Sequence, residues 1–391
     1  MQGKLLTIFL ALGLAGCATD RPLAIRCGSF DRFRIPVGET PGSGGDIGAA
    51  TVGSPLVEVF AQSFPQTAAA GSEGSSSFLV LSGGGQWGAF GAGFLKGWSE
   101  RGTGASTRPE RFDVVTGVST GALQATFAFL GRGQDQALLD AYSITNERQL
   151  VRRHGNLFFL NHASMADIGP LEGYLRTRLR PLLDQVAAPE NAGRRLLVGA
   201  VDGLDGRMYA FDLTRMAREL TGPEREDCYV GALLSSAAVP IVFRQVQVSG
   251  KPYLDGGVRQ SVFVTEIQEA AGRALDAGAR KGTIYVLMNG DVTPTRVAAL
   301  PPKLLPTVNR LRSIVFNQVE LSSVFAVASR FPGMTTKVAT AAGHDCEAPQ
   351  DEESEVFSPT VMACLRRYGQ ARWQNGDPWG VYHTPAHSEE H

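Results

Sequence analysis

From residue 78 onward, short apolar runs alternate with segments whose apolar residues recur at helical spacing. Residues 78–81 are four consecutive apolar residues that end at a cluster of serine and glycine, which predicts a buried strand entering a tight turn. Aromatic and aliphatic residues at helical spacing over 88–101 predict a helix. Residues 112–116 then predict a second strand, and residues 120–130 predict a helix rich in Ala, Leu and Phe.

The same alternation continues toward the C-terminus. Further strands are expected at 195–201, 208–212, 241–248 and 283–288. Helices are expected at 168–183, 229–238 and 264–277, with a long one inside 303–329. Apolar strands that alternate with helices are typical of a sheet covered on both faces. The pattern therefore predicts an α/β fold, a three-layer α/β/α sandwich around a mostly parallel sheet.

Two segments depart from this pattern. Residues 38–77 are rich in Gly, Ser, Ala, Thr and Pro, which indicates a tether or loosely packed arm, with 55–60 docking as an edge strand. The polar C-terminal residues indicate a mobile tail. The expected divisions are a signal peptide (1–16), an N-terminal arm and tether (17–77), a globular domain (78–345) and a C-terminal extension with its tail (346–391).

The N-terminal residues have the features of a secretory signal. A single charge, Lys4, precedes an apolar run over 5–14, which is too short to span a bilayer. Leu14-Ala15-Gly16-Cys17 resembles a bacterial lipobox, in which the cysteine is acylated and becomes the mature N-terminus. We expect a lipidated Cys17 that anchors the chain in a membrane, with a plain signal peptide as the alternative. Ala18, in place of Asp, favours the outer membrane.

Composition and charge exclude several classes of protein. The chain has 391 residues, of which 43% are hydrophobic and 19% charged, a balance typical of globular proteins. Lys and Arg number 37 against 38 Asp and Glu, so the charge indicates no polyanionic partner such as nucleic acid. The sequence has no H-E-x-x-H motif and no paired cysteine ligand spacing, and it predicts neither a metal site nor a cofactor.

Four cysteines remain besides Cys17, and in an exported chain they allow three disulfide connectivities. Cys346–Cys364 is the favoured pair because it closes a short polar loop, and Cys27–Cys228 follows by elimination. The alternative is that these cysteines are buried free thiols.

The most specific motif is Gly117-Val118-Ser119-Thr120-Gly121, which lies between a predicted strand and a predicted helix. This is the G-x-S-x-G pattern, which is typical of a nucleophilic serine when it lies between a strand and a helix. Gly117 and Gly121 allow the strand and helix to crowd around a strained turn that exposes Ser119 Oγ, and the helix directs its positive end at developing negative charge. Ser119 is thus a candidate nucleophile; an ordinary Gly-Ser turn is the alternative.

A glycine-rich loop, Ser82-Gly83-Gly84-Gly85-Gln86-Trp87-Gly88, also follows a predicted strand. Its G-x-G-x-x-G spacing fits a dinucleotide site, but no acidic residue ends the second strand, where a ribose ligand belongs. Consecutive glycines also present successive backbone N–H groups to an oxyanion, and one such donor contributes ~3–4 kcal/mol in a transition state. Gly83, Gly84 and Gly85 are therefore candidate oxyanion-hole residues, with a simple tight turn as the alternative.

A third motif, Asp255-Gly256-Gly257, follows a predicted strand near the sequence Ser235-Ser236-Ala237-Ala238-Val239-Pro240. A serine hydroxyl is a weak nucleophile and needs a base within hydrogen-bond reach. Asp255 is a candidate for that base because the two glycines let it approach closely. Alone, the motif would predict only a good turn.

In this order, the three motifs resemble those of the patatin-like phospholipases. That family has a Gly-Gly-Gly loop after its first strand, G-x-S-x-G about 35 residues later, and a distant Asp-Gly-Gly/Ala. In this chain, Ser119 follows Gly84 by 35 residues and precedes Asp255 by 136, and the resemblance extends over roughly 78–288. One position departs from the family pattern, because Trp87 stands where Arg or Lys is usual.

The resemblance implies a patatin-like catalytic domain over 78–345 and a serine acyl hydrolase that cleaves lipid esters, of the phospholipase A or lysophospholipase type. It implies a Ser–Asp dyad without histidine, in which Ser119 is the nucleophile and Asp255 the base. Gly83, Gly84 and Gly85 would form the oxyanion hole, supported by Gly117, Gly121, Gly256 and Gly257. A buried, desolvated site is expected, because Asp is otherwise a weak base.

Two other functions remain open from the sequence. A Ser-Asp-His triad esterase acting on small soluble esters would use His344, His383 or His387, which follow Asp255 in the order of α/β-hydrolases. A catalytically inactive, lipid-binding envelope lipoprotein is the other alternative. The six histidines, including His154, His162 and His391, are expected on the surface or in the tail. The oligomeric state is left open.

Overall fold

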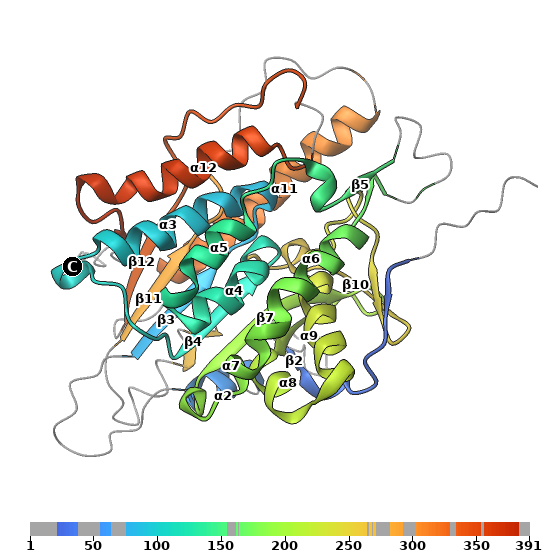
Figure 1. Ribbon diagram of the computed structural model, residues 1–391, viewed down its shortest axis with the longest axis horizontal. Coiled ribbons are helices and arrows are strands. Elements are labelled where there is room, and N and C mark those ends of the chain that lie inside the picture. The colour runs from blue at the N-terminus through green and yellow to red at the C-terminus, as the bar shows by residue number, and fades with distance from the viewer. Residues whose placement is uncertain are drawn as a thin grey trace, which may run out of the picture.

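The computed structural model describes residues 22–37, 55–63, 76–154, 162, 164–263, 266–267, 269–270, 282–291, 302, 304–328, 334–352 and 356–382 (Figure 1). The expected signal peptide, Cys17, His383, His387 and His391 lie outside these residues. Among the described helices, none is both long and apolar enough to cross a membrane.

One mixed sheet forms the centre of the described part of the chain, with the strand order β1-β9-β10-β7-β4-β3-β11-β12-β13; β8 also pairs with β7, and β2 with β8. The five central strands, from β7 to β12, are parallel, and the flanking pairs are mostly antiparallel. The strands are β1 (Ala24–Ile25), β2 (Arg34–Pro36), β3 (Ser76–Leu81), β4 (Val114–Val118), β7 (Arg195–Asp202), β8 (Met208–Asp212), β9 (Val246–Val248), β10 (Lys251–Asp255), β11 (Gly282–Leu287), β12 (Met334–Ala339) and β13 (Gly380–Tyr382). A separate ribbon pairs β5 (Arg152–Arg153) with β6 (Ala166–Asp167).

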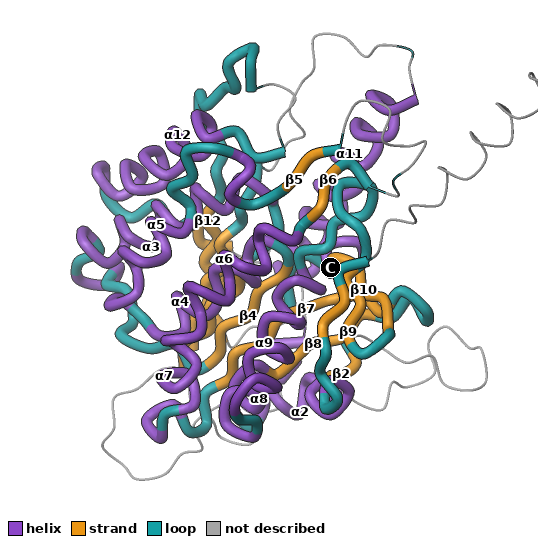
Figure 2. Tube along the Cα trace, turned by 45° about the vertical axis from the view of Figure 1, so that its right-hand side comes forward, coloured by secondary structure: helices purple, strands orange, loops and turns teal. Residues whose placement is uncertain are grey.

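Helices cover both faces of this sheet, so the expected three-layer α/β/α sandwich is confirmed (Figures 1 and 2). They are α2 (Pro55–Ala61), α3 (Gly88–Arg101), α4 (Thr120–Leu130), α5 (Asp135–Ala141), α6 (Gly169–Leu179), α7 (Leu183–Ala187), α8 (Leu213–Glu219), α9 (Gly222–Ser236), α11 (Leu304–Ala328) and α12 (Pro359–Ala371). Short 3-10 turns, among them η2 (Gly85–Trp87) and η9 (Gly256–Val258), connect several elements.

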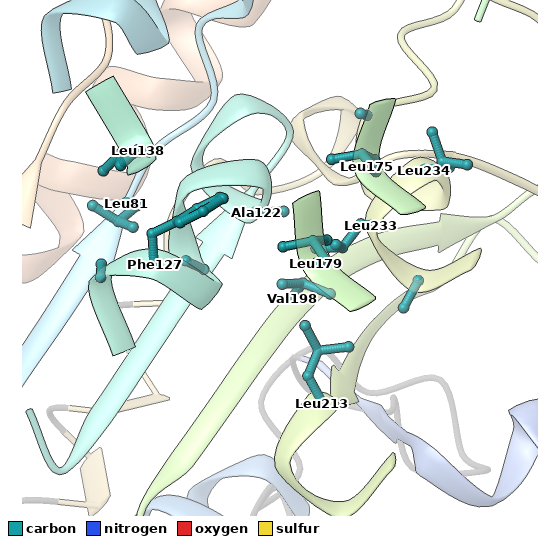
Figure 3. Close-up of a cluster of buried hydrophobic side chains, with 14 of the residues drawn as sticks. Leu81, Ala122, Phe127, Leu138, Leu175, Leu179, Val198, Leu213, Leu233 and Leu234 are labelled. Carbon is teal, nitrogen blue, oxygen red and sulfur yellow. The ribbon is translucent and has the colours of Figure 1, made fainter. Parts of the chain in front are cut away.

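Alternate residues of the central strands enter two different cores, which is why these strands are apolar at nearly every position. In β3, Leu79 and Leu81 face a large cluster with the helices α3 to α9 and α12, part of which Figure 3 shows. Phe78 and Val80 face a smaller cluster on the opposite side, which includes Phe60 of α2. The central strands of the sheet are therefore buried on both sides.

The expected positions of most central elements are confirmed within two residues, but three are corrections. The helix expected at 229–238 is α9, which begins at Gly222, and the helix expected at 168–183 ends at Leu179, before a 3-10 turn and α7. The third is the strand expected at 241–248. Only Val246–Val248 of that run is a strand, β9, and it forms a hairpin with β10 through Ser249 and Gly250, both at positive φ. A hairpin of this kind needs left-handed backbone in its turn. Of the helix expected at 264–277, residues 266–267 and 269–270 are described, and they are helical.

The N-terminal segment differs from the expected tether. Residues 22–37 add β1 and β2 to the sheet, and they bury Phe30 and Phe33 in the large core. Residues 55–60 were expected as an edge strand, but Pro55–Ala61 is an α-helix. Leu56, Val57 and Phe60 recur at the spacing of one helix face, and all three are buried. Parts of residues 22–37 and 55–61 thus belong to the hydrophobic cores of the domain.

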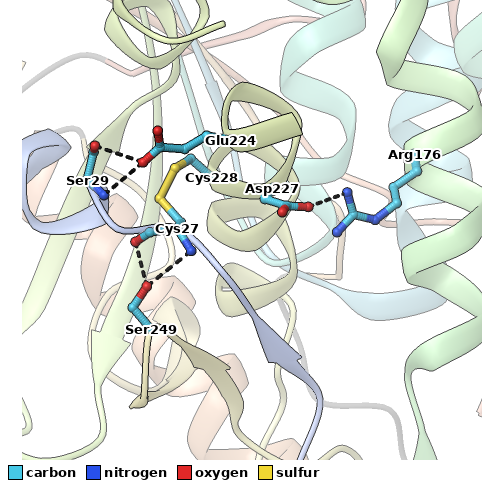
Figure 4. The surroundings of a disulfide bond; sticks show 7 residues. All are labelled: Cys27, Ser29, Arg176, Glu224, Asp227, Cys228 and Ser249. Atoms are coloured by element: carbon cyan, nitrogen blue, oxygen red, sulfur yellow. Dashed lines mark hydrogen bonds and ion pairs between the residues drawn. A yellow bond between two sulfur atoms is a disulfide. The ribbon is translucent and has the colours of Figure 1, made fainter. Parts of the chain in front are cut away.

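Both expected disulfides are present, so the alternative of free thiols is wrong. Cys27 is bonded to Cys228, which ties the N-terminal segment to α9 (Figure 4). Ser249 Oγ accepts a hydrogen bond from Cys27 N and donates one to Cys27 O, fixing the same segment against the β9–β10 hairpin. Cys346 is bonded to Cys364 at the other end of the domain.

The expected C-terminal extension is also integrated into the fold. Helix α12 packs directly on α3, because glycines bring the two backbones together: a Cβ on Gly93 would lie 2.0 Å from Arg366 O, and one on Gly369 would lie 2.3 Å from Phe90 O. Strand β13 then pairs with β12 at the sheet edge. Helix α12 also contacts η2 of the glycine loop, and Ser358 N donates to Gln86 Oε1 of that loop.

Candidate active site

Ser119 lies in the sharp turn between β4 and α4, as the G-x-S-x-G motif predicts. Its backbone has φ 56° and ψ −125°, a region that a residue with a side chain rarely occupies. The two glycines allow this turn: a Cβ on Gly117 would lie 2.3 Å from Gly121 O, and a Cβ on Gly121 would lie 2.3 Å from Leu81 O. The strained turn holds Ser119 at the end of the sheet and at the N-terminus of α4.

The glycine loop lies beside this turn. A Cβ on Gly83 would lie 3.3 Å from Ser119 Cβ, so the loop and the serine are in contact. Gly84 has φ 145° and Gly85 has φ 59°, and a Cβ on Gly84 would lie 1.7 Å from Asn289 O. Position 84 therefore requires glycine, because a side chain would be strained at this φ and would collide with Asn289 O.

The three glycines do not offer equivalent N–H groups. Gly83 N donates to Ser261 Oγ at 3.2 Å, which differs from its expected role as an oxyanion donor. Among the described residues, no acceptor is bonded to the N–H of Gly84 or Gly85. These two groups are therefore the candidates for binding an oxyanion.

Asp255 is the last residue of β10 and is completely buried. Gly257 N donates to its Oδ1 at 2.7 Å, and Asp255 N donates to Ala238 O at 3.0 Å. The Asp255 side chain is thus held by Gly257, the second glycine of the motif. Its backbone N–H is held by Ala238, which precedes β9. Ser119 is also buried, with 6% of its surface exposed, so the expected desolvated site is confirmed.

Strand pairing brings the two motifs to the same end of the sheet. Val118 pairs with Gly199 of β7, and the next residue of β7, Ala200, pairs with Asp255. A Cβ on Gly256 would lie 2.6 Å from Gly199 O and 3.0 Å from Val118 Cγ1. The Asp-Gly-Gly turn therefore packs against the residue that precedes Ser119.

Ser236, the last residue of α9, connects these elements and was not singled out from the sequence. Ser119 N donates to Ser236 Oγ at 2.9 Å, and Ser236 Oγ donates to Gly199 O at 2.6 Å. One buried hydroxyl thus links the serine turn to β7, the strand that separates it from Asp255. The only sequence signal was the Ser-Ser-Ala-Ala-Val-Pro run, which does not indicate which serine has this role.

A second buried polar group lies beneath the glycine loop and was also missed. Ser82 Oγ lies 2.6 Å from Glu320 Oε1 and accepts a hydrogen bond from Asn289 N at 2.8 Å. Asn289 Nδ2 donates to Ser82 O and to Gln124 Oε1. Burial raises the pKa of Glu320 to about 7, although the hydrogen bond to Ser82 acts in the opposite direction. No local sequence pattern marks a glutamate on α11 as a partner of this loop.

His344 is the candidate triad histidine within the described residues, and its contacts are structural. Its Nδ1 accepts a hydrogen bond from Cys346 N at 2.9 Å, and its ring packs edge-on against Trp87, with centroids 4.6 Å apart. In a neutral imidazole with Nδ1 as acceptor, Nε2 carries the proton and cannot accept another. His154 and His162 stack on each other, with centroids 3.7 Å apart.

Asp345, Cys346 and Cys364 lie close enough together to resemble a metal site. Their two sulfur atoms are bonded to each other in a disulfide, and only a thiolate ligates a metal well. This cluster therefore does not offer a set of metal ligands.

The described fold is thus an α/β domain with a strained serine turn between a central strand and a helix. Residues 79–267 match the model of the patatin-like phospholipase family. The match includes the glycine loop, Ser119 and Asp255. It extends from β3 to just beyond the Asp-Gly-Gly turn.

Among solved structures, the chain resembles that of VipD from Legionella pneumophila. The two are 11% identical, the comparison covers 79% of this chain and 68% of that one, and the TM-score is 0.35. This similarity is too weak to support an argument about function. None of the curated proteins matches the sequence.

Ser236→Ala should slow the acylation of Ser119 by a nitrophenyl ester about 10- to 100-fold, because the turn loses its link to β7. The matched control is Ser235→Ala, since Ser235 is equally buried and its hydroxyl has no hydrogen-bond partner among the described residues. Single-turnover acylation and the melting temperature should be measured for both. Equal acylation rates in the two variants would show that the Ser236 bridge does not position Ser119.

Proposed function

We propose that the domain is a serine acyl hydrolase that cleaves ester bonds of lipids through a Ser119–Asp255 dyad. The observation that carries this proposal is the strained Ser119 turn, held by Ser236 to the strand that pairs with Asp255. The match of residues 79–267 to the patatin-like phospholipase family model supports lipid esters as the class of substrate.

In the proposed reaction, Ser119 Oγ attacks the ester carbonyl while Asp255 accepts the hydroxyl proton. Gly84 N–H and Gly85 N–H stabilise the tetrahedral oxyanion, each contributing about 3 kcal/mol if it follows measured oxyanion donors. Asp255 then returns the proton to the leaving alcohol, which gives an acyl-enzyme. A water molecule, deprotonated by Asp255, attacks the acyl-enzyme. The bond between the acyl carbon and Ser119 Oγ then breaks, Asp255 returns the proton to Ser119 Oγ, and the fatty acid is released.

Surface chemistry near the dyad also supports a lipid substrate. Helix α11 packs over the Asp-Gly-Gly turn, since a Cβ on Gly257 would lie 3.1 Å from Phe316 Cε1. The same helix exposes Leu311, Ile314 and Val315 at the spacing of one helix face. An exposed aliphatic face of this kind is suited to contact with acyl chains or a lipid surface.

The dyad predicts a specific ranking of variants. Ser119→Ala and Asp255→Asn should each abolish hydrolysis of a nitrophenyl ester, because an amide cannot accept the proton that Asp255 receives. Replacing His344, His383 and His387 together should leave at least about half of the acylation rate, whereas loss of a triad histidine would cost on the order of 10⁴-fold. Circular dichroism checks the fold of each variant. A triple histidine variant as inactive as Ser119→Ala would rule out the dyad in favour of a triad esterase.

The aliphatic face of α11 predicts a difference between lipid aggregates and monomeric esters. Leu311→Glu should lower turnover of phospholipid vesicles about tenfold and leave turnover of a short-chain nitrophenyl ester unchanged. The control is Leu204→Glu, because Leu204 is 74% exposed in the turn between β7 and β8. Vesicle turnover that is equal in the two variants would exclude this face as the lipid contact.

We also propose that Cys17 is lipidated and anchors the protein in a membrane of the cell envelope, with the outer membrane favoured by Ala18. The lipobox-like sequence Leu14-Ala15-Gly16-Cys17 supports this. Cys17→Ala should shift the protein from the membrane fraction to the soluble fraction, because acyl chains contribute ~0.8 kcal/mol per buried CH₂. Cell fractionation measures this. A variant that stays quantitatively in membranes would exclude the lipid anchor.

A further inference from the structure

The buried carboxyl of Glu320 has no place in the dyad, yet it contacts the residue that begins the glycine loop. Its Oε1 lies 2.6 Å from Ser82 Oγ. The same Oγ lies 2.8 Å from Gly83 O and accepts from Asn289 N at 2.8 Å. Three polar neighbours therefore share one hydroxyl.

The number of protons available limits which of these three contacts can be hydrogen bonds at the same time. A serine hydroxyl has one proton to donate and two lone pairs that accept. If Glu320 is ionised, it and Gly83 O are both acceptors and compete for the single Ser82 proton. If Glu320 is protonated, it donates to Ser82 Oγ, which also accepts from Asn289 N and donates to Gly83 O. Only the protonated carboxyl satisfies all three contacts.

The direction of Gly83 O matters because it belongs to the same peptide unit as Gly84 N–H. A trans peptide is planar, so its N–H points opposite to its C=O, and fixing one group fixes the other. Gly84 N–H is one of the two candidate oxyanion donors. We propose that protonated Glu320 is a positioning residue that, through Ser82, holds the Gly83–Gly84 peptide in the orientation that stabilises the oxyanion. This inference rests on the proposed serine hydrolase function.

The orientation of the oxyanion loop should depend on pH near neutrality, because it depends on the proton of Glu320. Glu320 faces Ser82 after β3 and Gly290 after β11, where a Cβ on Gly290 would lie 3.1 Å from its Oε2. Burial is the main cause of its raised pKa, and among the described residues no charged group adds to it. With a pKa of about 7, Glu320 loses its proton as pH rises through neutrality, and the loop then loses its fixed orientation.

The test is single-turnover acylation by a nitrophenyl ester from pH 5 to pH 9. The wild-type rate should fall about tenfold in all as pH rises through about 7, and should level off toward pH 9. Glu320→Gln should stay within about twofold of the wild-type maximum with no such fall, because its amide donates to Ser82 Oγ at every pH. Glu320→Ala should lower kcat about tenfold at every pH and change KM little, because the donor is lost and substrate binding is not.

Glu266→Gln is the matched control, since Glu266 is a second buried carboxyl whose pKa burial raises, and it accepts a hydrogen bond from Gln260 Nε2 instead of contacting Ser82. This variant should keep the wild-type fall. A wild-type rate that does not fall, a Glu320→Gln profile that still falls, or a Glu320→Gln variant as slow as Glu320→Ala would each overturn the proposal.

A second readout separates this inference from the proposed function. A carboxyl with a raised pKa binds more protons in the folded chain than in the unfolded chain, so stability is lost as pH rises from the ordinary pKa of 4.5 to about 7 and stays constant above that. The melting temperature of Glu320→Gln minus that of wild type should therefore increase from pH 5 to pH 8. If it does and wild type shows no ester turnover, the proposed function is wrong although Glu320 titrates as stated. A flat difference overturns the inference alone.

Discussion

The left-handed backbone of Ser119 is the constraint on which the rest of the site depends. A residue in such a conformation costs of order 1–3 kcal/mol, which surrounding structure must offset. Here the offset comes from close packing of β4, β3 and α4, which the missing side chains of Gly117 and Gly121 permit, and from the hydrogen bond between Ser119 N and Ser236 Oγ. The turn is thus held by close packing against β3 and α4 and by a hydrogen bond from α9.

Buried polar groups then build the chemical environment around that turn. Asp255, Ser82, Asn289 and Ser236 are all almost inaccessible to solvent. Burying such groups is costly unless they are hydrogen-bonded, and a connected network is stiffer than its separate pairs. The candidate site is therefore preorganised, because hydrogen bonds fix both Asp255 and the glycine loop.

The sequence was sufficient for the elements that depend on local pattern. The strand at 208–212 and the helices at 88–101 and 120–130 were placed correctly, because their hydrophobic spacing is strong and their ends carry clear turn residues. The three motifs also indicated Ser119 and Asp255, because glycines at fixed positions reflect backbone conformations that other residues avoid.

What the sequence did not reveal depends on contacts between distant residues. Ser82 and Glu320 are 238 positions apart, and Ser119 and Ser236 are 117 apart, so no local period connects them. The N-terminal segment looked like a tether because glycine and serine dominate its composition. Its burial depends on a disulfide to α9 and on pairing with β8 and β9, neither of which is a local property. The occupied N–H of Gly83 likewise became evident only through Ser261.

The central claim is that Asp255 directly activates Ser119. Labelling with a fluorophosphonate, followed by peptide mapping with mass spectrometry, tests it most directly, because the probe reacts only with an activated serine. The account predicts one adduct, on Ser119, and a labelling rate at least about 10³-fold lower in Asp255→Asn than in wild type. An adduct on another residue, or an Asp255→Asn variant that labels as fast as wild type, would contradict it.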